Sequence, residues 1–184
     1  MLAMQLTEPA PITSDPLRMV ELPDPVPAVG EVRIAVRACA ICRTDLHVIE
    51  GDLPRARLPI IPGHQIVGVV DQLGPDCRRF QLGDRVGIAW LRCTCGVCRF
   101  CRAGQENLCE QAQFTGYHAD GGYATHATVL EDFAYAIPPQ FSDVEAAPLL
   151  CAGIIGYRSF ARANIPSGGN VGLYGFGSSA HVVI

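Results

Sequence analysis

The stretch CTCGVCRFCRAGQENLC, residues 93–109, holds five of the chain's nine cysteines within seventeen positions. From the second cysteine onward, the spacing is C-x2-C-x2-C-x7-C. The four residues of this pattern are Cys95, Cys98, Cys101 and Cys109. Paired thiolates at a two-residue spacing can converge on one tetrahedral ion, and Gly96 and Gly104 relax the backbone around them. The pattern predicts a closed structural zinc site, which leaves no coordination position for a substrate.

The overall composition limits the classes of protein that could contain such a site. The 184 residues suffice for one domain, or for one domain and part of a second. With 49% apolar and 17% charged residues, the chain can bury a core and is not disordered. A net charge of −4 argues against a nucleic-acid partner or an anionic membrane. No basic leader opens the sequence, and prolines and charges interrupt each apolar stretch before it reaches membrane-spanning length. We therefore expect a cytoplasmic chain whose thiols stay reduced.

Up to about residue 140, the sequence is typical of short strands separated by turns of Gly, Pro and Asp. In residues 31–37, Val32, Ile34 and Val36 alternate with charged or small residues, as in a half-buried strand. Three further segments have strand character: 65–74, 83–90 and 121–129. This spacing indicates a β-rich barrel or sandwich.

The pattern changes after residue 140. Ser142 and Glu145 form a capping-box pattern, which predicts a helical region that ends near Asn164. A Pro-Ser-Gly-Gly linker at 166–169 follows, and then a short apolar run at 171–174 that we expect to be a strand.

A glycine turn follows that run: Gly175-x-Gly177-x-x-Ala180. A glycine turn between a strand and a helix is typical of a dinucleotide-binding site, because the helix N-terminus can receive the pyrophosphate. The acidic residue that would bind the ribose hydroxyl of the dinucleotide is expected about 20 positions further on, beyond Ile184.

Three separated segments each contain a good zinc ligand. They are CAICRTDLH at 39–47, PGHQIVG at 62–68 and LLCAGIIGY at 149–157, and the ligand types are Cys42, His64 and Cys151. Three protein ligands and one open position would make the geometry of a catalytic zinc.

Other interpretations of the cysteines remain open. Cys39 and Cys42 also form a C-x-x-C motif of the thioredoxin type, although they follow a strand of a β-rich region rather than lying in a βαβ unit. Arginines 92, 99 and 102 would suit a nucleic-acid-binding zinc module, but the acidic chain argues against it. Cys39, Cys77 and Cys93 are expected to be free thiols.

Taken together, these motifs resemble the N-terminal catalytic part of the zinc-dependent medium-chain alcohol dehydrogenases over residues 20–184. The motifs are C-R-T-D-x-H at 42–47, G-H at 63–64, G-D-R-V at 83–86, the four-cysteine lobe at 93–109, C-A-G at 151–153 and G-x-G-x-x-A at 175–180. The resemblance implies a mostly β fold: a GroES-like barrel with a zinc-binding lobe over residues 1–150. Residues 151–184 would be a connecting helix and the first strand, turn and helix of a truncated Rossmann domain.

The resemblance also implies two zinc ions per chain, a structural one in the four-cysteine lobe and a catalytic one on Cys42, His64 and Cys151. It assigns a proton relay to Thr44 and His47, in which Thr44 accepts the alcohol proton and His47 passes it on to solvent. Asp45 would orient His64. The cofactor-binding residues it implies are Arg43, Gly175, Gly177 and Ala180. Gln65 stands where the family usually has Glu, which removes a negative charge near the metal.

The implied function is oxidation of a small alcohol to an aldehyde or ketone by hydride transfer to NAD or NADP, in a parent protein expected to be a homo-oligomer. Leu53 stands where some relatives carry a bulky aromatic residue, which suggests a wider pocket. The residues present would be an N-terminal fragment, inactive alone. The alternative is a non-catalytic zinc-binding GroES-like domain that acts as a scaffold or interaction module.

Overall fold

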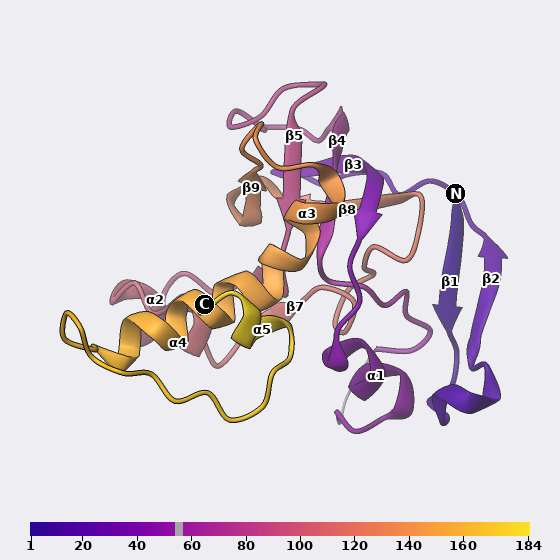
Figure 1. The fold of residues 1–184 in the computed structure, drawn as a ribbon. Coiled ribbons are helices and arrows are strands. Elements are labelled where there is room, and N and C mark those ends of the chain that lie inside the picture. The colour runs from indigo at the N-terminus through magenta and orange to yellow at the C-terminus, as the bar shows by residue number, and fades with distance from the viewer. Residues whose placement is uncertain (54–56) are drawn as a thin grey trace.

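The computed structural model describes residues 1–53 and 57–184, and up to about residue 140 these form a β-rich body around one curled sheet (Figure 1). The sheet has the strand order β8-β3-β4-β5-β9, and every neighbouring pair is antiparallel. Its strands are β3 (Glu31–Cys39), β4 (Ile66–Leu73), β5 (Arg85–Ile88), β8 (His126–Leu130) and β9 (Ala134–Ala136). The mostly β fold and the curled barrel-like sheet predicted from the sequence are confirmed.

Two small antiparallel sheets flank the large one. One pairs β1 (Leu2–Leu6) with β2 (Leu17–Glu21), and the other pairs β6 (Leu91–Cys93) with β7 (Gln113–Phe114). The second of these sheets frames the four-cysteine segment, because β6 precedes it and β7 follows it in the chain.

Short helices fill the connections. They are η1 (Ile12–Ser14), α1 (Arg43–Glu50), α2 (Arg99–Arg102), η2 (Glu106–Leu108), η3 (Glu131–Phe133), α3 (Asp143–Pro148), the π-helical turn η4 (Leu149–Gly153), α4 (Ile154–Ala163) and α5 (Ser178–His181). None of these described helices combines the length and the apolar character that a bilayer span would need.

The alternation in the sequence decides which face of the sheet is buried. Val32 and Ile34 on β3 are fully buried, and they pack with apolar side chains of the neighbouring strands. The buried members of this core are Val32, Ile34, Ile66, Val70, Val86, Ile88, Ala127, Val129 and Ala134. Burial of one such aliphatic side chain stabilises the fold by roughly 1.5–3 kcal/mol, so the core fixes the register of the sheet.

Of the four strands predicted before residue 140, three agree closely with β3, β4 and β5. The prediction for 121–129 is only partly right, because β8 begins at His126. The N–H groups of Gly121, Gly122 and Tyr123 donate instead to the carbonyls of the loop at 61–63, over 2.7 to 3.0 Å. This loop pairing competes with strand pairing and ties the segment to the residues around His64.

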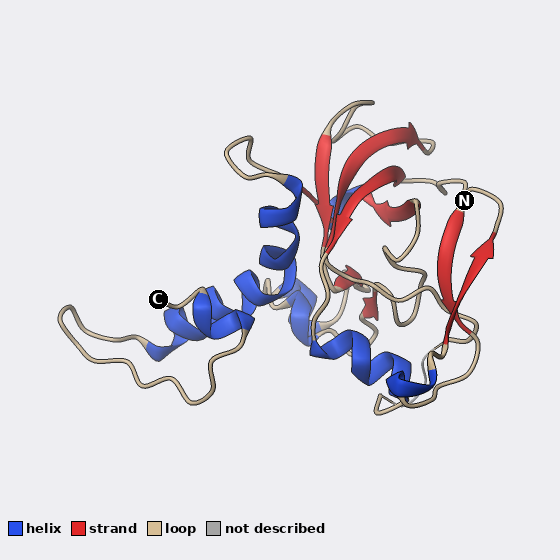
Figure 2. Ribbon diagram, turned by 45° about the vertical axis from the view of Figure 1, so that its right-hand side comes forward, coloured by secondary structure: helices blue, strands red, loops and turns tan. Residues whose placement is uncertain are grey.

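The predicted helical region after residue 140 is present. Ser142 Oγ accepts from the Glu145 N–H, and the Glu145 carboxylate accepts from the Ser142 N–H, so the capping box forms. Pro148 ends α3, the π-helical turn follows, and α4 ends where Asn164 adopts a left-handed conformation with φ of 46°. Figure 2 shows these helices leading away from the sheet toward the C-terminus.

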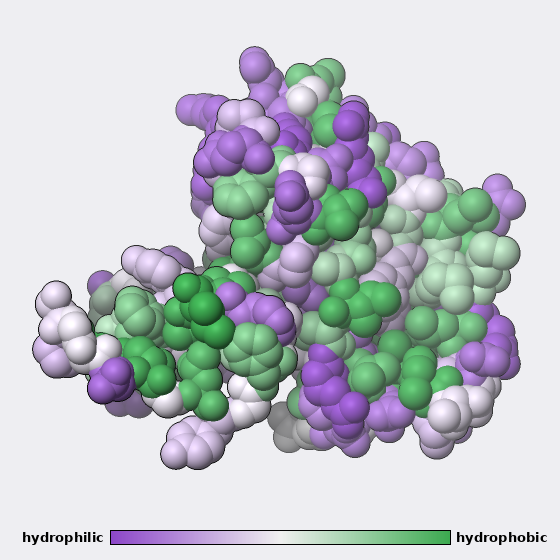
Figure 3. Space-filling model, viewed as in Figure 1, coloured by the Kyte–Doolittle hydropathy of each residue, from purple (hydrophilic) through white to green (hydrophobic). Residues whose placement is uncertain are grey.

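The prediction of a strand at 171–174 is wrong for this structure, because these residues have no strand pairing. A strand needs a neighbour for its N–H and C=O groups, and none of the described residues supplies one here. α5 nevertheless begins directly after the glycine turn, with Gly177 as its N-cap. We call α4 and the residues after it, 154–184, the C-terminal arm. Apolar side chains gather on this arm (Figure 3). Exposed ones are Ile155, Tyr157, Phe160, Tyr174 and Phe176.

Candidate metal centres

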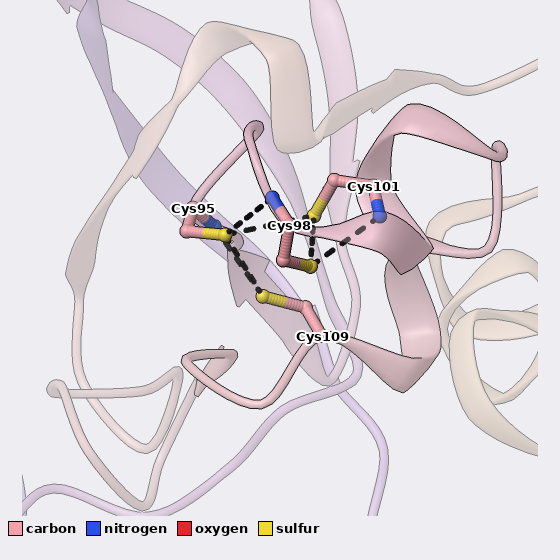
Figure 4. Close-up of side chains that lie close together, drawn as sticks. All are labelled: Cys95, Cys98, Cys101 and Cys109. Atoms are coloured by element: carbon pink, nitrogen blue, oxygen red, sulfur yellow. Dashed lines mark hydrogen bonds between the residues drawn. The ribbon is translucent and has the colours of Figure 1, made fainter.

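The four cysteines of the C-x2-C-x2-C-x7-C pattern converge on one point (Figure 4). Their sulfur atoms all lie within 4.8 Å of one another. The Cys98–Cys101, Cys95–Cys109 and Cys95–Cys101 sulfur pairs are 3.5, 3.6 and 3.9 Å apart. Four sulfurs at about 2.3 Å from a central zinc would be about 3.8 Å apart, so this donor set fits a tetrahedral ion.

The backbone of the four-cysteine lobe favours thiolates over thiols. The Cys98 N–H donates to Cys95 Sγ at 3.4 Å, and the Cys101 N–H donates to Cys98 Sγ at 3.5 Å. Hydrogen bonds from the N–H groups of Val97 and Cys98 lower the pKa of Cys95 to about 6. The Cys101 N–H also lowers the pKa of Cys98, whereas burial raises the pKa of Cys101 to about 11, so Cys101 would lose its proton on metal binding.

Gly96 and Gly104 have the conformations that these turns require. Their φ angles are 70° and 68°, in the left-handed region that residues with a Cβ rarely adopt. Gly96 therefore lets the first C-x2-C turn bring Cys95 and Cys98 together without strain, and Gly104 does the same for the loop between Cys101 and Cys109.

A second convergence involves three distant segments. Cys42 Sγ lies 3.5 Å from His64 Nε2 and 4.0 Å from Cys151 Sγ, and the three ligand atoms lie within 4.8 Å of one another. Two sulfurs and one imidazole nitrogen form a donor set that suits zinc and leaves a fourth position open. The structure thus brings together the three residues that the sequence singled out.

Local structure explains how each of the three residues reaches this point. Cys42 is the N-cap of α1, directly after β3, and its sulfur accepts from the Thr44 N–H at 3.3 Å. His64 lies in the loop that enters β4. Cys151 lies in the π-helical turn that follows Pro148. Such turns often occur at functional sites because they change the direction of a helical side chain.

His64 is held by a buried carboxylate. Asp45 Oδ1 lies 3.1 Å from His64 Nδ1, and Asp45 Oδ2 accepts from the Cys42 N–H at 2.8 Å. Both side chains are about 2% exposed or less. The pair fixes the ring: Nδ1 donates a hydrogen bond to Asp45, and Nε2 faces the two sulfurs, where it can bind a metal once it has lost its proton.

The electrostatics of this cluster favour a cation. Burial opposes the charged imidazolium, but hydrogen bonds to Asp45 and Cys42 outweigh it and raise the pKa of His64 to about 9. A hydrogen bond from Cys151, followed by those from His64 and Thr44, lowers the pKa of Cys42 well below its usual range. The Cys42 thiolate and burial in turn raise the pKa of Cys151. Negative charge thus lies on the Cys42 thiolate and the Asp45 carboxylate, whereas Cys151 would lose its proton on binding a cation.

The predicted relay residues lie on the same helix as Cys42. Thr44 and His47 occupy the first and last turns of α1, and Arg43 is exposed at its start. Sequence reasoning missed the partner of His47: Asp52 Oδ2 lies 2.7 Å from His47 Nδ1. The signal that could have found it is Gly51, a helix-ending glycine that turns the next side chain back over the last helical turn.

Two other residues near the cluster have clear positions. Gln65 is buried, and its Nε2 donates to the Ala40 carbonyl at 3.2 Å. Cys39 packs its sulfur against Gly63 and Gly122, and burial raises its pKa to about 12. An inert, buried thiol does not suit the redox interpretation of the C-x-x-C motif.

The glycine turn lies on the C-terminal arm. Gly175 has a φ of 88°, and α5 spans only four residues. α5 packs closely against α4, because a Cβ added to Gly156 of α4 would lie 2.6 Å from the Ser179 carbonyl of α5. α5 also lies beside the π-helical turn that carries Cys151. Ala180 thus lies on a short helix beside the turn that carries Cys151, and Gly177 is the N-cap of that helix.

Comparisons with known proteins identify the family of the chain. Residues 28–139 match the family described as the alcohol dehydrogenase GroES-like domain. The chain is 55% identical over 187 residues to a probable alcohol dehydrogenase, AdhA, of Mycobacterium tuberculosis, covering 99% of this chain and 54% of that protein. It thus spans about half the length of the curated relatives it matches.

Solved structures give the same result. The chain is similar to a thermostable alcohol dehydrogenase from Pyrobaculum aerophilum with bound cobalt and zinc, with a TM-score of 0.81 and 32% identity over 90% of this chain and 49% of the other. It is also similar to CAD from Helicobacter pylori in complex with NADP(H). That match has a TM-score of 0.85 and 26% identity over 100% of this chain and 57% of the other.

Proposed function

Because this chain belongs to the zinc-dependent medium-chain alcohol dehydrogenase family, we propose that it forms the catalytic domain of an enzyme that oxidises an alcohol to an aldehyde or ketone with NAD or NADP. The observation that carries the proposal is the convergence of Cys42, His64 and Cys151 from three distant segments onto one point. Residues 1–150 would provide the GroES-like domain, and residues 151–184 would begin the dinucleotide-binding part.

The two centres would have different tasks. Cys95, Cys98, Cys101 and Cys109 would hold a structural zinc, since four sulfurs complete a tetrahedron and leave no place for a substrate. The other centre would hold a second zinc with one position free. Zinc bound there would act as a Lewis acid that lowers the pKa of the alcohol hydroxyl.

The remaining residues would handle the proton and the cofactor. Thr44 would accept the alcohol proton, and His47 would pass it to solvent, because His47 is half-exposed while His64 is buried. Asp52 would hold His47 Nδ1 and leave Nε2 to receive the proton. Arg43 would meet the cofactor pyrophosphate as an exposed charged donor.

The pocket can be outlined from the same residues. Trp90 packs edge-on against His64, with ring centroids 5.0 Å apart, and it stacks on Phe114. Leu53 packs on the neighbouring apolar cluster. We propose that the substrate is a small alcohol, aldehyde or ketone whose apolar part lies against these side chains.

The test is metal analysis combined with an assay of the protein isolated at its natural length. We expect two zinc ions per chain and oxidation of simple alcohols with NAD or NADP. The Cys151→Ser variant should lose one zinc and the activity, while the four-cysteine zinc remains. Two zinc ions without any dehydrogenase activity would favour a non-catalytic zinc-binding module.

A further inference from the structure

The G-D-R-V motif at residues 83–86 runs into strand β5 and lies outside both metal centres. Its arginine, Arg85, contacts the segment of the chain that leads to Cys151. Arg85 Nε donates to Asp143 Oδ1 at 2.7 Å, and Arg85 Nη2 donates to the Phe141 carbonyl. The side chains of Arg85 and Asp143 are each 25% exposed. The arginine thus holds the first residue of helix α3 and the loop before it on the sheet.

The same face of β5 supports the far end of this helical segment. Side chains alternate along a strand, so positions 85 and 87 point to one face. A Cβ added to Gly87 would lie 2.8 Å from Leu150 Cδ1, so Leu150 packs directly onto the strand backbone at this glycine. Leu150 precedes Cys151 in the π-helical turn η4. β5 therefore contacts the segment at two points, Asp143 at the start of α3 and Leu150 beside the metal ligand.

The apolar packing of α3 consists mainly of small side chains. The buried members of its cluster are Val67, Ala89, Ala146, Ala147 and Leu150. An alanine buries only one methyl group, so this packing resists rotation of the helix less than larger side chains would. The two bonds from Arg85 are directional and charge-assisted, and they fix the orientation of α3 on the strand.

Cys151 depends on this support more than the other two ligands do. Asp45 accepts from both the Cys42 N–H and His64 Nδ1, so one carboxylate ties those two segments together. Cys151 reaches the centre from a separate helical segment, and its Sγ lies 4.0 Å from Cys42 Sγ. Metal–ligand distances vary by only about 0.2 Å, so a small rotation of α3 would take Cys151 out of bonding distance of a shared ion.

We propose that Arg85 is a positioning residue, which fixes helix α3 on β5 and so places Cys151 at the metal centre. The inference rests on the proposed function, because it concerns the third ligand of the centre at Cys42. It gives the G-D-R-V motif a task, since the strand that begins there sets the position of a ligand much further along the chain. Loss of the ion pair should leave Cys42 and His64 in place and weaken the bond of the third ligand alone.

The test compares Arg85→Gln with Arg33→Gln in the natural-length protein loaded with cobalt(II), which accepts the same ligands as zinc and is coloured. Arg33 is the matched control, because its Nε donates to Asp71 Oδ1 at 3.0 Å between β3 and β4 of the same sheet. Thiolates bound to cobalt absorb in the near ultraviolet, and the difference spectrum between the parent and Cys151→Ser gives the band of Cys151. Arg85→Gln should lose most of this band, and Arg33→Gln should keep it.

The second readout is the rate at which zinc passes to a chelator, with Cys101→Ser to identify the phase of the four-cysteine lobe. Arg85→Gln should release the zinc at Cys42 roughly tenfold faster, as for other residues that orient metal ligands. The four-cysteine zinc should leave at the parent rate. The double variant Arg85→Gln/Asp143→Ala should release zinc no faster than Arg85→Gln, because the two side chains act as one unit. A merely structural role would lower the melting temperature of Arg85→Gln and Arg33→Gln alike and leave the Cys151 band unchanged.

The outcomes separate the two claims. A Cys151 band of parent strength in Arg85→Gln, with cobalt bound at Cys42, would overturn the role of Arg85 and leave the proposed function standing. Equal loss of the band in Arg33→Gln would also overturn it. Asp143→Ala removes the same ion pair from the helix side and decides the question by the same spectrum if Arg85→Gln does not fold. A parent protein that binds no metal at Cys42 would overturn the proposed function and the inference with it.

Discussion

His47 Nδ1 lies 2.7 Å from Asp52 Oδ2, across the turn that ends helix α1. The turn is well fixed, because Gly51 is left-handed with a φ of 82° and both Gly51 and Asp52 donate backbone N–H groups to the His47 carbonyl. A Cβ on Gly51 would lie 2.9 Å from the Pro9 side chain. The aspartate therefore determines which nitrogen of His47 is free to take a proton.

Removal of this acceptor should affect turnover more than stability. Asp52→Ala is expected to lower kcat several-fold with little change in KM, as part of the roughly 10²–10⁴-fold contribution of a positioned acid or base. The free energy of unfolding should change by no more than about 1 kcal/mol, because the pair is half-exposed. Steady-state kinetics and denaturant unfolding of the natural-length protein measure both effects. An unchanged kcat would exclude His47 and Asp52 from the proton path.

Much of the candidate site could be predicted from the sequence, because ligand types and their spacing are local properties. The two-residue spacing of Cys95, Cys98 and Cys101 is visible in the sequence, and the motif around Cys42 also contains Asp45. Asp52 was missed because its partnership depends on how the helix ends at Gly51. The strand at 171–174 was wrongly predicted because strand formation depends on neighbours, and an apolar run alone does not supply them. The contact between Arg85 and Asp143 appears only in three dimensions.

The four-cysteine lobe should hold its zinc independently of the other centre. Cys101→Ser is expected to lose one zinc per chain and to make residues 93–109 sensitive to protease, since metal binding supplies the folding energy of such loops. Cys93→Ser is the matched control, because Cys93 lies in the same segment with its thiol directed at the Thr94 carbonyl. Metal analysis and limited proteolysis follow both changes. Two zinc ions retained by Cys101→Ser would contradict the assignment.

The zinc at Cys42, His64 and Cys151 should leave before the structural one. Its ligands come from three distant segments, and its fourth position is exchangeable, whereas the lobe provides four thiolates from one loop. A mild chelator should therefore release zinc in two phases of about equal amplitude, and activity should disappear with the first. Simultaneous loss of both ions, or one ion in total, would contradict the proposal of two centres.

Gln65 provides a test of charge near this centre. Its Nε2 donates to the Ala40 carbonyl, so Gln65→Glu removes a hydrogen bond and introduces a buried negative charge. We expect the metal-free chain to lose stability and the zinc-loaded chain to lose less, because the cation compensates the new carboxylate. Thermal melts with and without zinc measure the difference, and Gln113→Glu at an exposed position is the control. Equal destabilisation in both states would show that this side chain does not sense the metal.

The purified chain of residues 1–184 should bind zinc and show no alcohol oxidation. Hydride transfer requires the nicotinamide to be held within roughly 3–3.5 Å of the alcohol carbon. Residues 171–174 form no strand, and the exposed glycine turn ends in a helix of four residues, so none of the sheets in residues 1–53 and 57–184 supports a bound dinucleotide there. The apolar side chains of this arm, such as Tyr174 and Phe176, should also promote self-association. The assay is alcohol oxidation with NAD and separately with NADP, beside the natural-length protein, with sedimentation to follow association. Turnover by a preparation free of longer chains would show that residues 1–184 already position the cofactor, and the roles assigned to the arm would have to be revised.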